Sequence, residues 1–141
     1  METVNVLIAG EVDLPDLCAL CDAIGLGHMP NQPRVDLEGI MQLATGRVWI
    51  ARQGGVAVGL IAAMFEGRRG WICYFGVAES SRKSELGPEL LATAEQFLKS
   101  LEARKVLLMV RNTAPALQRY CAKRGYAVDD VTVMGKWLIS V

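Results

Sequence analysis

The chain has 141 residues, of which 52% are apolar and 21% charged, and its 15 basic residues balance 15 acidic ones. This balance argues against a partner held mainly through phosphate charge, so we expect neither nucleic acid nor an anionic membrane as a partner. No apolar run approaches the roughly 18 residues that span a bilayer, and no charged-then-apolar leader opens the chain. These features predict a cytoplasmic protein with one compact domain over residues 1–141.

Four cysteines stand at positions 18, 21, 73 and 121. Cys18 and Cys21 form a C-x-x-C, but a thioredoxin-like redox pair would follow a strand and open a helix. Here the pair falls inside a helical pattern, and the chain has only one histidine and no second C-x-x-C. We therefore expect reduced thiols in the core, and no metal site.

The first part of the chain predicts a strand followed by two helices. Residues 4–9 form an apolar run with strand character, and Asp13 is placed to cap a helix that ends at Gly25. A loop rich in Gly and Pro follows, and a short helix is predicted over 35–44.

The hydrophobic period then changes to that of strands. Residues 47–52, 56–65 and 71–77 predict three strands joined by tight turns, and 86–101 predicts a strongly amphipathic helix. A continuous apolar strand over 105–110 suits the centre of a sheet covered on both faces. The remaining segments predict a helix over 114–124, stopped by Gly125, and one or two closing strands in 126–141.

This element order predicts an α/β fold with a mixed central β-sheet flanked by helices. Three strands linked by hairpins must be antiparallel, whereas a strand reached through the helix 86–101 is parallel to the one before it.

The segment 80–90, SSRKSELGPEL, connects the strand 71–77 to the start of the helix at residue 86. Free N–H groups and the positive end of a helix dipole meet at such a junction. Arg82 adds a charged fork, and Gly87 allows a ligand to approach the backbone closely. There is no G-x-x-x-x-G-K-[ST] and no G-x-G-x-x-G. On these residues alone, the segment is either an ordinary loop or a pyrophosphate site formed by backbone and one arginine.

Several motifs in order resemble those of the GNAT superfamily of acyl-CoA N-acyltransferases, from the first strand to about Leu138. Arg82, Glu85 and Gly87 fall on the family's [QR]-x-x-G-x-[GA], where coenzyme A pyrophosphate binds. Downstream, VRNTAPALQRYCAKRGY is similar to N-x-x-x-A-x-x-x-Y-x-x-x-x-G-[FY], with Asn112 and Tyr120 at two of its positions. The end of the chain and the loop around Asn31 resemble a group of small bacterial members.

The resemblance implies an N-acetyltransferase that moves an acetyl group from acetyl-CoA to a primary amine by direct attack. The CoA thiol, with a pKa of about 8.5, leaves more easily when a nearby acid gives it a proton, and Tyr120 stands where the family places that acid. The alternative is a packed core tyrosine. The residues expected to contact acetyl-CoA are Phe75, Gly76, Val77, Arg82, Lys83, Ser84, Glu85, Leu86, Gly87 and Asn112.

Two positions depart from the family pattern. Many relatives place a glutamate, the general base, where this chain has Trp71, and the substitutes Glu66, Asp36, Glu38 or a water held by Tyr74 leave the base unassigned. Glu85 replaces a glycine, which adds a side chain and removes a freedom of φ that matters if this residue is left-handed, and it also puts a carboxylate near the pyrophosphate. At ~6 Å and an effective dielectric of ~20, each like-charge pair costs on the order of 3 kcal/mol before screening.

Two functions therefore compete. One is an acetyl-CoA-dependent N-acetyltransferase acting on a small molecule, a peptide or a protein. The other is a catalytically weak or inactive acyl-CoA-binding module in which the pyrophosphate turn has degenerated. The last strand predicted, TVMGKWLISV, supplies an edge for a possible homodimer.

Overall fold

The structure, a computed structural model, describes residues 3–139 and divides after Met109 into two compact units. The first unit carries a five-stranded sheet with three helices, and the second carries one helix and the C-terminal segment. The expectation that residues 1–141 form a single domain stays a prediction.

Each helix predicted from the sequence is present, and so is each strand up to residue 109. The elements of the first unit are β1 (Val4–Ile8), α1 (Leu14–Ala23), α2 (Pro33–Met41), β2 (Gly46–Gln53), β3 (Val56–Phe65), β4 (Gly70–Val77), α3 (Leu86–Ser100) and β5 (Val106–Leu108). Short 3-10 turns at Glu11–Asp13 and Glu79–Ser81 precede α1 and follow β4.

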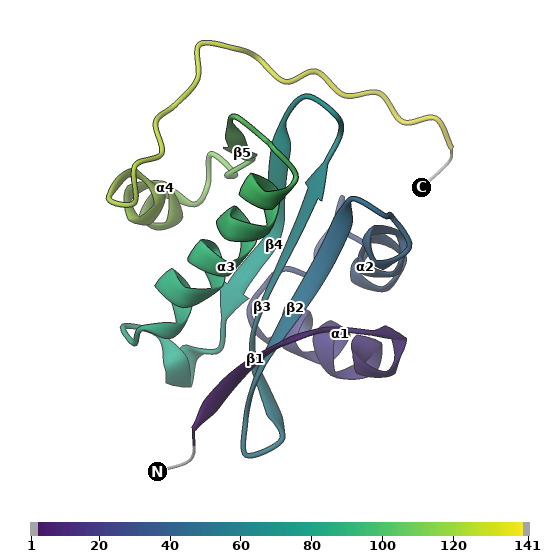
Figure 1. Cartoon of the computed structure of the whole chain (residues 1–141), viewed down its shortest axis with the longest axis vertical. Helices are drawn as coiled ribbons and strands as arrows, with labels where there is room; N and C mark the ends of the chain where they lie inside the picture. The colour runs from purple at the N-terminus through teal and green to yellow at the C-terminus, as the bar shows by residue number, and fades with distance from the viewer. Residues whose placement is uncertain (1–2, 140–141) are drawn as a thin grey trace. The chain divides into compact units, whose positions relative to one another are not determined.

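The sheet has the order β1-β2-β3-β4-β5 (Figure 1). The pairs β1–β2, β2–β3 and β3–β4 are antiparallel. The pair β4–β5, which the crossover through α3 connects, is parallel. The mixed α/β sheet predicted from the element order is therefore confirmed. The predicted central position of the strand in 105–110 is wrong, because β5 forms an edge of this sheet.

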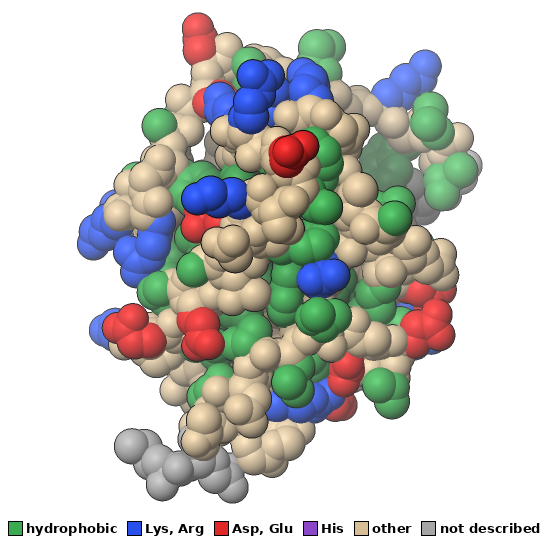
Figure 2. Space-filling view, in the orientation of Figure 1, with side chains coloured by type: hydrophobic (Ala, Val, Ile, Leu, Met, Phe, Trp, Pro, Cys, Tyr) green, Lys and Arg blue, Asp and Glu red, His purple; other side chains and the backbone are tan. Residues whose placement is uncertain are grey.

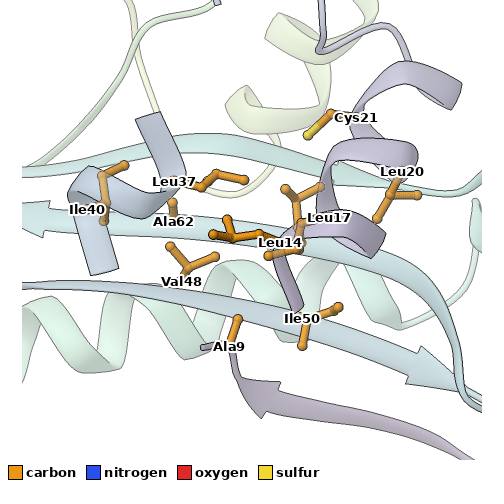
Figure 3. Packing of buried hydrophobic residues seen from close by; sticks show 11 residues of the cluster. Ala9, Leu14, Leu17, Leu20, Cys21, Leu37, Ile40, Val48, Ile50 and Ala62 are labelled. Carbon is orange, nitrogen blue, oxygen red and sulfur yellow. The ribbon is translucent and has the colours of Figure 1, made fainter. Parts of the chain in front are cut away.

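Helices cover both faces of the sheet (Figure 1). Under α1 and α2 lies a core cluster, most of which Figure 3 labels: Ala9, Leu14, Leu17, Leu20, Cys21, Leu37, Ile40, Val48, Ile50, Leu60 and Ala62. Because side chains alternate along a strand, the residues of β3 next to Leu60 and Ala62 face α3 instead. A Cβ built on Gly59 would lie 3.0 Å from Leu90 Cδ1, so glycine there allows α3 to pack closely on β3.

The predicted capping role of Asp13 is wrong. Asp13 has helical dihedrals, φ −86° and ψ −10°, because the 3-10 turn runs directly into α1, and its side chain caps no amide of α1. Its carboxylate instead accepts a hydrogen bond from Gly10 N and one from Arg52 Nη2, at 2.9 and 2.8 Å. These two bonds lower the pKa of Asp13, and the second ties the start of α1 to β2.

The C-x-x-C pair lies inside α1, as the helical pattern predicted, and its thiols are free. Burial raises the pKa of Cys21 to about 12 and also raises the pKa of Cys18. A reactive redox pair needs a lowered thiol pKa, so the structure favours core thiols over redox chemistry. In the part of the chain that the structure describes, no group of three or more His, Cys, Asp or Glu side chains gathers as metal ligands would.

The second unit contains α4 (Pro115–Ala122), which a turn through Gly125 at φ +96° follows. The prediction of closing strands after residue 126 is wrong for the described residues up to 139, which form no strand. The apolar alternation there meets no partner strand, and Val131, Val133, Met134, Trp137 and Leu138 are exposed. The last two residues of the strand proposed for dimer pairing, 140–141, lie outside the described residues, and the dimer stays a prediction.

Basic and acidic side chains are interspersed on the face shown in Figure 2, in keeping with the zero net charge. Within residues 3–139, no helix is both long and apolar enough to cross a membrane.

Candidate active site

Strand β4 loses one of its two partners halfway along its length. It pairs with β3 over nearly its whole course, but its pairing with β5 covers only Gly70, Trp71 and Ile72. From Cys73 to Val77, no strand of the first unit pairs with β4 on the β5 side (Figure 1). Within the first unit, this half of β4 is therefore an edge without strand pairing on the β5 side, and an extended ligand can hydrogen-bond to backbone groups there, such as those of Val77.

A β-bulge marks the same half of the strand. Leu60 pairs with Gly76 and Ala62 with Cys73, so Tyr74 and Phe75 together oppose Ile61. Tyr74 has φ +52°, which is unusual for a residue with a side chain. As a result, Cys73 and Tyr74 both pack against the core cluster under α1 and α2, although adjacent strand residues normally face opposite ways. The bulge bends β4 where its pairing with β5 ends.

Two further features shape the open edge. Ala78 N donates to Val58 O on β3 at 2.7 Å. Because successive amides of a strand point to opposite sides, the amide of Val77 points away from β3, toward the side on which β5 pairs with the first half of β4. A Cβ on Gly76 would lie 2.6 Å from Ile24 Cδ1, so the segment that follows α1 packs directly on the backbone at Gly76.

The turn between β4 and α3 has a left-handed residue, but it is Lys83, with φ +63°, and not Glu85. Glu85 is right-handed helical, with φ −78° and ψ −2°. The backbone cost expected for a left-handed residue 85 therefore does not arise. What remains of the expected conflict at Glu85 is its charge.

The start of α3 offers amide groups to a ligand. Leu86 N donates to Ser84 Oγ at 3.2 Å, and the Ser84 hydroxyl donates in turn to Ser81 O. Among the described residues, the amides of Glu85 and Gly87 have no protein acceptor. Arg82, Lys83 and Glu85 are exposed, so this junction can receive an anion beside two basic side chains and one acidic one.

A tyrosine–carboxylate pair lies beside the bulge. Tyr74 Oη donates a hydrogen bond of 2.6 Å to Asp36 Oδ2 in the first turn of α2, and the same oxygen accepts one of 3.0 Å from Gln32 N. Burial first, and then the hydrogen bond to Asp36, raise the pKa of Tyr74 above its usual range. Tyr74 therefore remains a protonated donor throughout the physiological pH range.

The other candidate bases are engaged elsewhere. Glu66 accepts hydrogen bonds from Arg68 Nε at 2.9 Å and from Trp71 Nε1 at 3.2 Å, in the hairpin before β4. At ~3.3 Å per strand residue, this hairpin is far from Val77 at the other end of β4. Glu38 lies 4.0 Å from Arg34 in an exposed ion pair on α2. Of the groups weighed as bases, the structure brings together only Asp36 and Tyr74.

Asn112 and Tyr120 belong to the second unit. Asn112 is exposed in the turn before α4, and Tyr120 is half-buried on α4 with the Arg124 guanidinium 4.3 Å from its ring centroid. In this contact the cation of Arg124, just after α4, lies over the face of the Tyr120 ring. Their roles in binding and catalysis stay predictions.

Residues 23–126 match the model of the acetyltransferase (GNAT) family. Because this match covers most of the chain, the protein belongs to that family, and it is an acyltransferase. The resemblance seen in the sequence motifs is confirmed.

Several known proteins are similar over nearly the whole chain. An acetyltransferase of Yersinia enterocolitica is 26% identical over 127 residues, which cover 90% of each chain. The solved structure of an aminoglycoside N-acetyltransferase in complex with CoA matches with a TM-score of 0.81 at 16% identity, covering 99% of this chain and 97% of that one. A ribosomal-protein-alanine N-acetyltransferase from Brucella melitensis matches with a TM-score of 0.76 at 13% identity, covering 96% and 99%. These structural likenesses support the fold.

Proposed function

We propose that this protein is an N-acetyltransferase that transfers the acetyl group of acetyl-CoA to a primary amine of a small molecule, a peptide or a protein. The observation that carries the proposal is the open half of β4, which leads directly into the amide groups at the start of α3. An acyl-CoA has the matching parts, an extended pantetheine with amides and a doubly charged pyrophosphate. The CoA complex of the similar aminoglycoside acetyltransferase supports this assignment.

The residues of the first unit fit acetyl-CoA in two groups. The backbone of Phe75, Gly76 and Val77 would bind the thioester carbonyl and the pantetheine along the open edge. The turn would surround the pyrophosphate with the backbone and side chains of Arg82, Lys83, Ser84, Glu85, Leu86 and Gly87. Asn112 would add a hydrogen bond to the pantetheine or to the turn.

The chemistry is a direct acyl transfer. The neutral amine attacks the thioester carbonyl, a C–N bond forms, and the carbonyl oxygen becomes an oxyanion that a backbone N–H of β4 stabilises. The intermediate collapses, the C–S bond breaks, and the sulfur leaves as a thiolate. Tyr120 would donate a proton to this thiolate, and the attacking nitrogen would lose one to water.

The first experiment is a calorimetric titration of the natural protein with acetyl-CoA at low and moderate salt, followed by a thiol-release assay with a panel of primary amines. We expect binding that weakens with salt, because the pyrophosphate contact is ionic and exposed. Absence of acetyl-CoA binding would contradict the proposal. Binding with no transfer to any amine would instead support the alternative, a binding module with a degenerate turn.

The role of Tyr120 is tested by Tyr120→Phe. We expect kcat to fall by about 100-fold, a typical contribution of general acid catalysis, while the calorimetric Kd of acetyl-CoA changes little. Phenylalanine keeps the ring that contacts Arg124, so the fold should be retained. A variant with unchanged kcat would show that Tyr120 is only a packed aromatic residue.

A further inference from the structure

Asp36 is a fixed carboxylate without a countercharge. Both of its recorded hydrogen bonds, from Tyr74 Oη and from Gln32 N, end on Oδ2. No Lys or Arg in the described part of the chain forms an ion pair with it. Its other oxygen, Oδ1, therefore has no protein donor among the described residues, and the half-buried side chain stays in contact with solvent.

The surroundings of Asp36 increase its attraction for a cation. The titratable groups that act on Tyr74 are Asp36, Cys21 and Cys73. Burial raises the pKa of both thiols to about 12, so they are neutral at pH 7. Tyr74 is neutral as well, so none of these three neighbours offsets the charge of the half-buried Asp36 carboxylate. A partly buried anion is stabilised when an opposite charge binds to it.

A purely structural role does not account for the whole arrangement. Capping the start of α2 requires only the bond from Gln32 N. The bond to Tyr74 depends on a bulge and on φ +52°, a left-handed conformation that is strained in a residue with a side chain. Such strain is concentrated at functional sites, and here it lies in the residue directly before Phe75.

We propose that Asp36 binds an ammonium group of the acceptor, with Tyr74 as the positioning residue, and that the acceptor carries two amino groups. This inference rests on the proposed function and specifies its substrate class. A carboxylate stabilises the charged form of an amine, whereas the attacking amine must be neutral. The ammonium on Asp36 is therefore the one that does not react.

The length of the Tyr74 side chain sets the spacing that such an acceptor has to span. The Asp36 carboxylate is separated from the backbone of β4 by the length of the Tyr74 side chain and one hydrogen bond. An acceptor whose second amino group is several carbon atoms from the first can place its ammonium on Asp36 and its neutral amine at the open edge of β4.

The test compares cadaverine, which has two amino groups, with 5-amino-1-pentanol, in which a neutral hydroxyl replaces one of them. Binding of each to the CoA-saturated protein is measured by calorimetry, and kcat/KM is measured with acetyl-CoA. For the natural protein we expect at least a tenfold preference for cadaverine, and for Asp36→Asn a preference below about threefold. Tyr74→Phe should give an intermediate value.

The matched control is Glu38→Gln, which removes a carboxylate from the same helix and should keep the full preference. Asparagine at position 36 can still accept from Gln32 N, and a thermal melt verifies that the variant is folded. Equal binding of the two probes by the natural protein, no binding of either, or an undiminished preference in Asp36→Asn would each overturn the inference. Failure of the proposed function is seen separately, as loss of acetyl-CoA binding or of transfer, since diamine binding is measured without turnover.

Discussion

The two halves of β4 differ in almost every respect. From Gly70 to Ile72 the strand is paired on both sides, with β3 and with β5. From Cys73 to Val77 it is bulged and half-buried, contains a residue at φ +52°, and keeps only β3 as a partner in the first unit.

This contrast shows how one strand serves as both scaffold and site. Regular pairing satisfies the backbone groups of the first half internally, so nothing there is available to a ligand. Ending the pairing with β5 exposes backbone groups in the second half, and the bulge turns Tyr74 toward Asp36. The candidate site therefore lies where the regular pattern stops, beside the rigid part that supports it.

The largest effect should come from shortening a side chain in the scaffold half. Ile72 is 3% exposed and pairs with Ala63 and Leu108, so we expect Ile72→Ala to lower the free energy of unfolding by about 2–5 kcal/mol. Val77→Ala in the half-buried site half should cost clearly less. Urea unfolding measures both, and equal losses would contradict the distinction between the halves.

The charge of Glu85 should have the next largest effect. Because its backbone is right-handed helical, Glu85→Gln removes the carboxylate without a need for glycine. We expect acetyl-CoA to bind about tenfold more tightly at low salt, with a smaller gain at moderate salt. Glu89→Gln, in the first turn of the same helix, is the control and should change the Kd much less. Equal gains in the two variants would indicate a general charge effect on α3.

The smallest effect concerns the backbone of Lys83 at φ +63°. Lys83→Gly and Lys83→Ala remove the same charge, but only glycine adopts this conformation without strain. We expect the glycine variant to be more stable by about 1 kcal/mol, measured by thermal or urea unfolding. Equal stability of the two variants would contradict strain in the backbone at position 83.

The sequence predicts most of the fold of the first unit because its elements are long and strongly patterned. The apolar stripe of α3 and the continuous apolar runs of β2 and β3 fix the element types with little dependence on the partner, and the two strands are buried over their middle residues. Motif resemblance predicts the turn at Arg82–Gly87 and backbone contacts at Phe75–Val77, but it does not predict that β5 stops pairing with β4 after Ile72. The strand expected after residue 126 failed because an alternating pattern forms a strand only when a partner is available to pair with it.

The sequence by itself determined the element order, the mixed sheet and membership of the acetyltransferase family, whereas the expected burial of the cysteines is complete only for Cys21 and Cys121. These follow from local periodicity and from motifs short enough to be read along the chain. The tertiary structure alone decided that β5 is an edge, that Lys83 and not Glu85 is left-handed, and that Tyr74 meets Asp36. The position of β5 depends on strand pairing, and the bond between Tyr74 and Asp36 joins segments 38 residues apart. No local pattern specifies such contacts. The left-handed residue in the turn depends on how the chain connects β4 to α3.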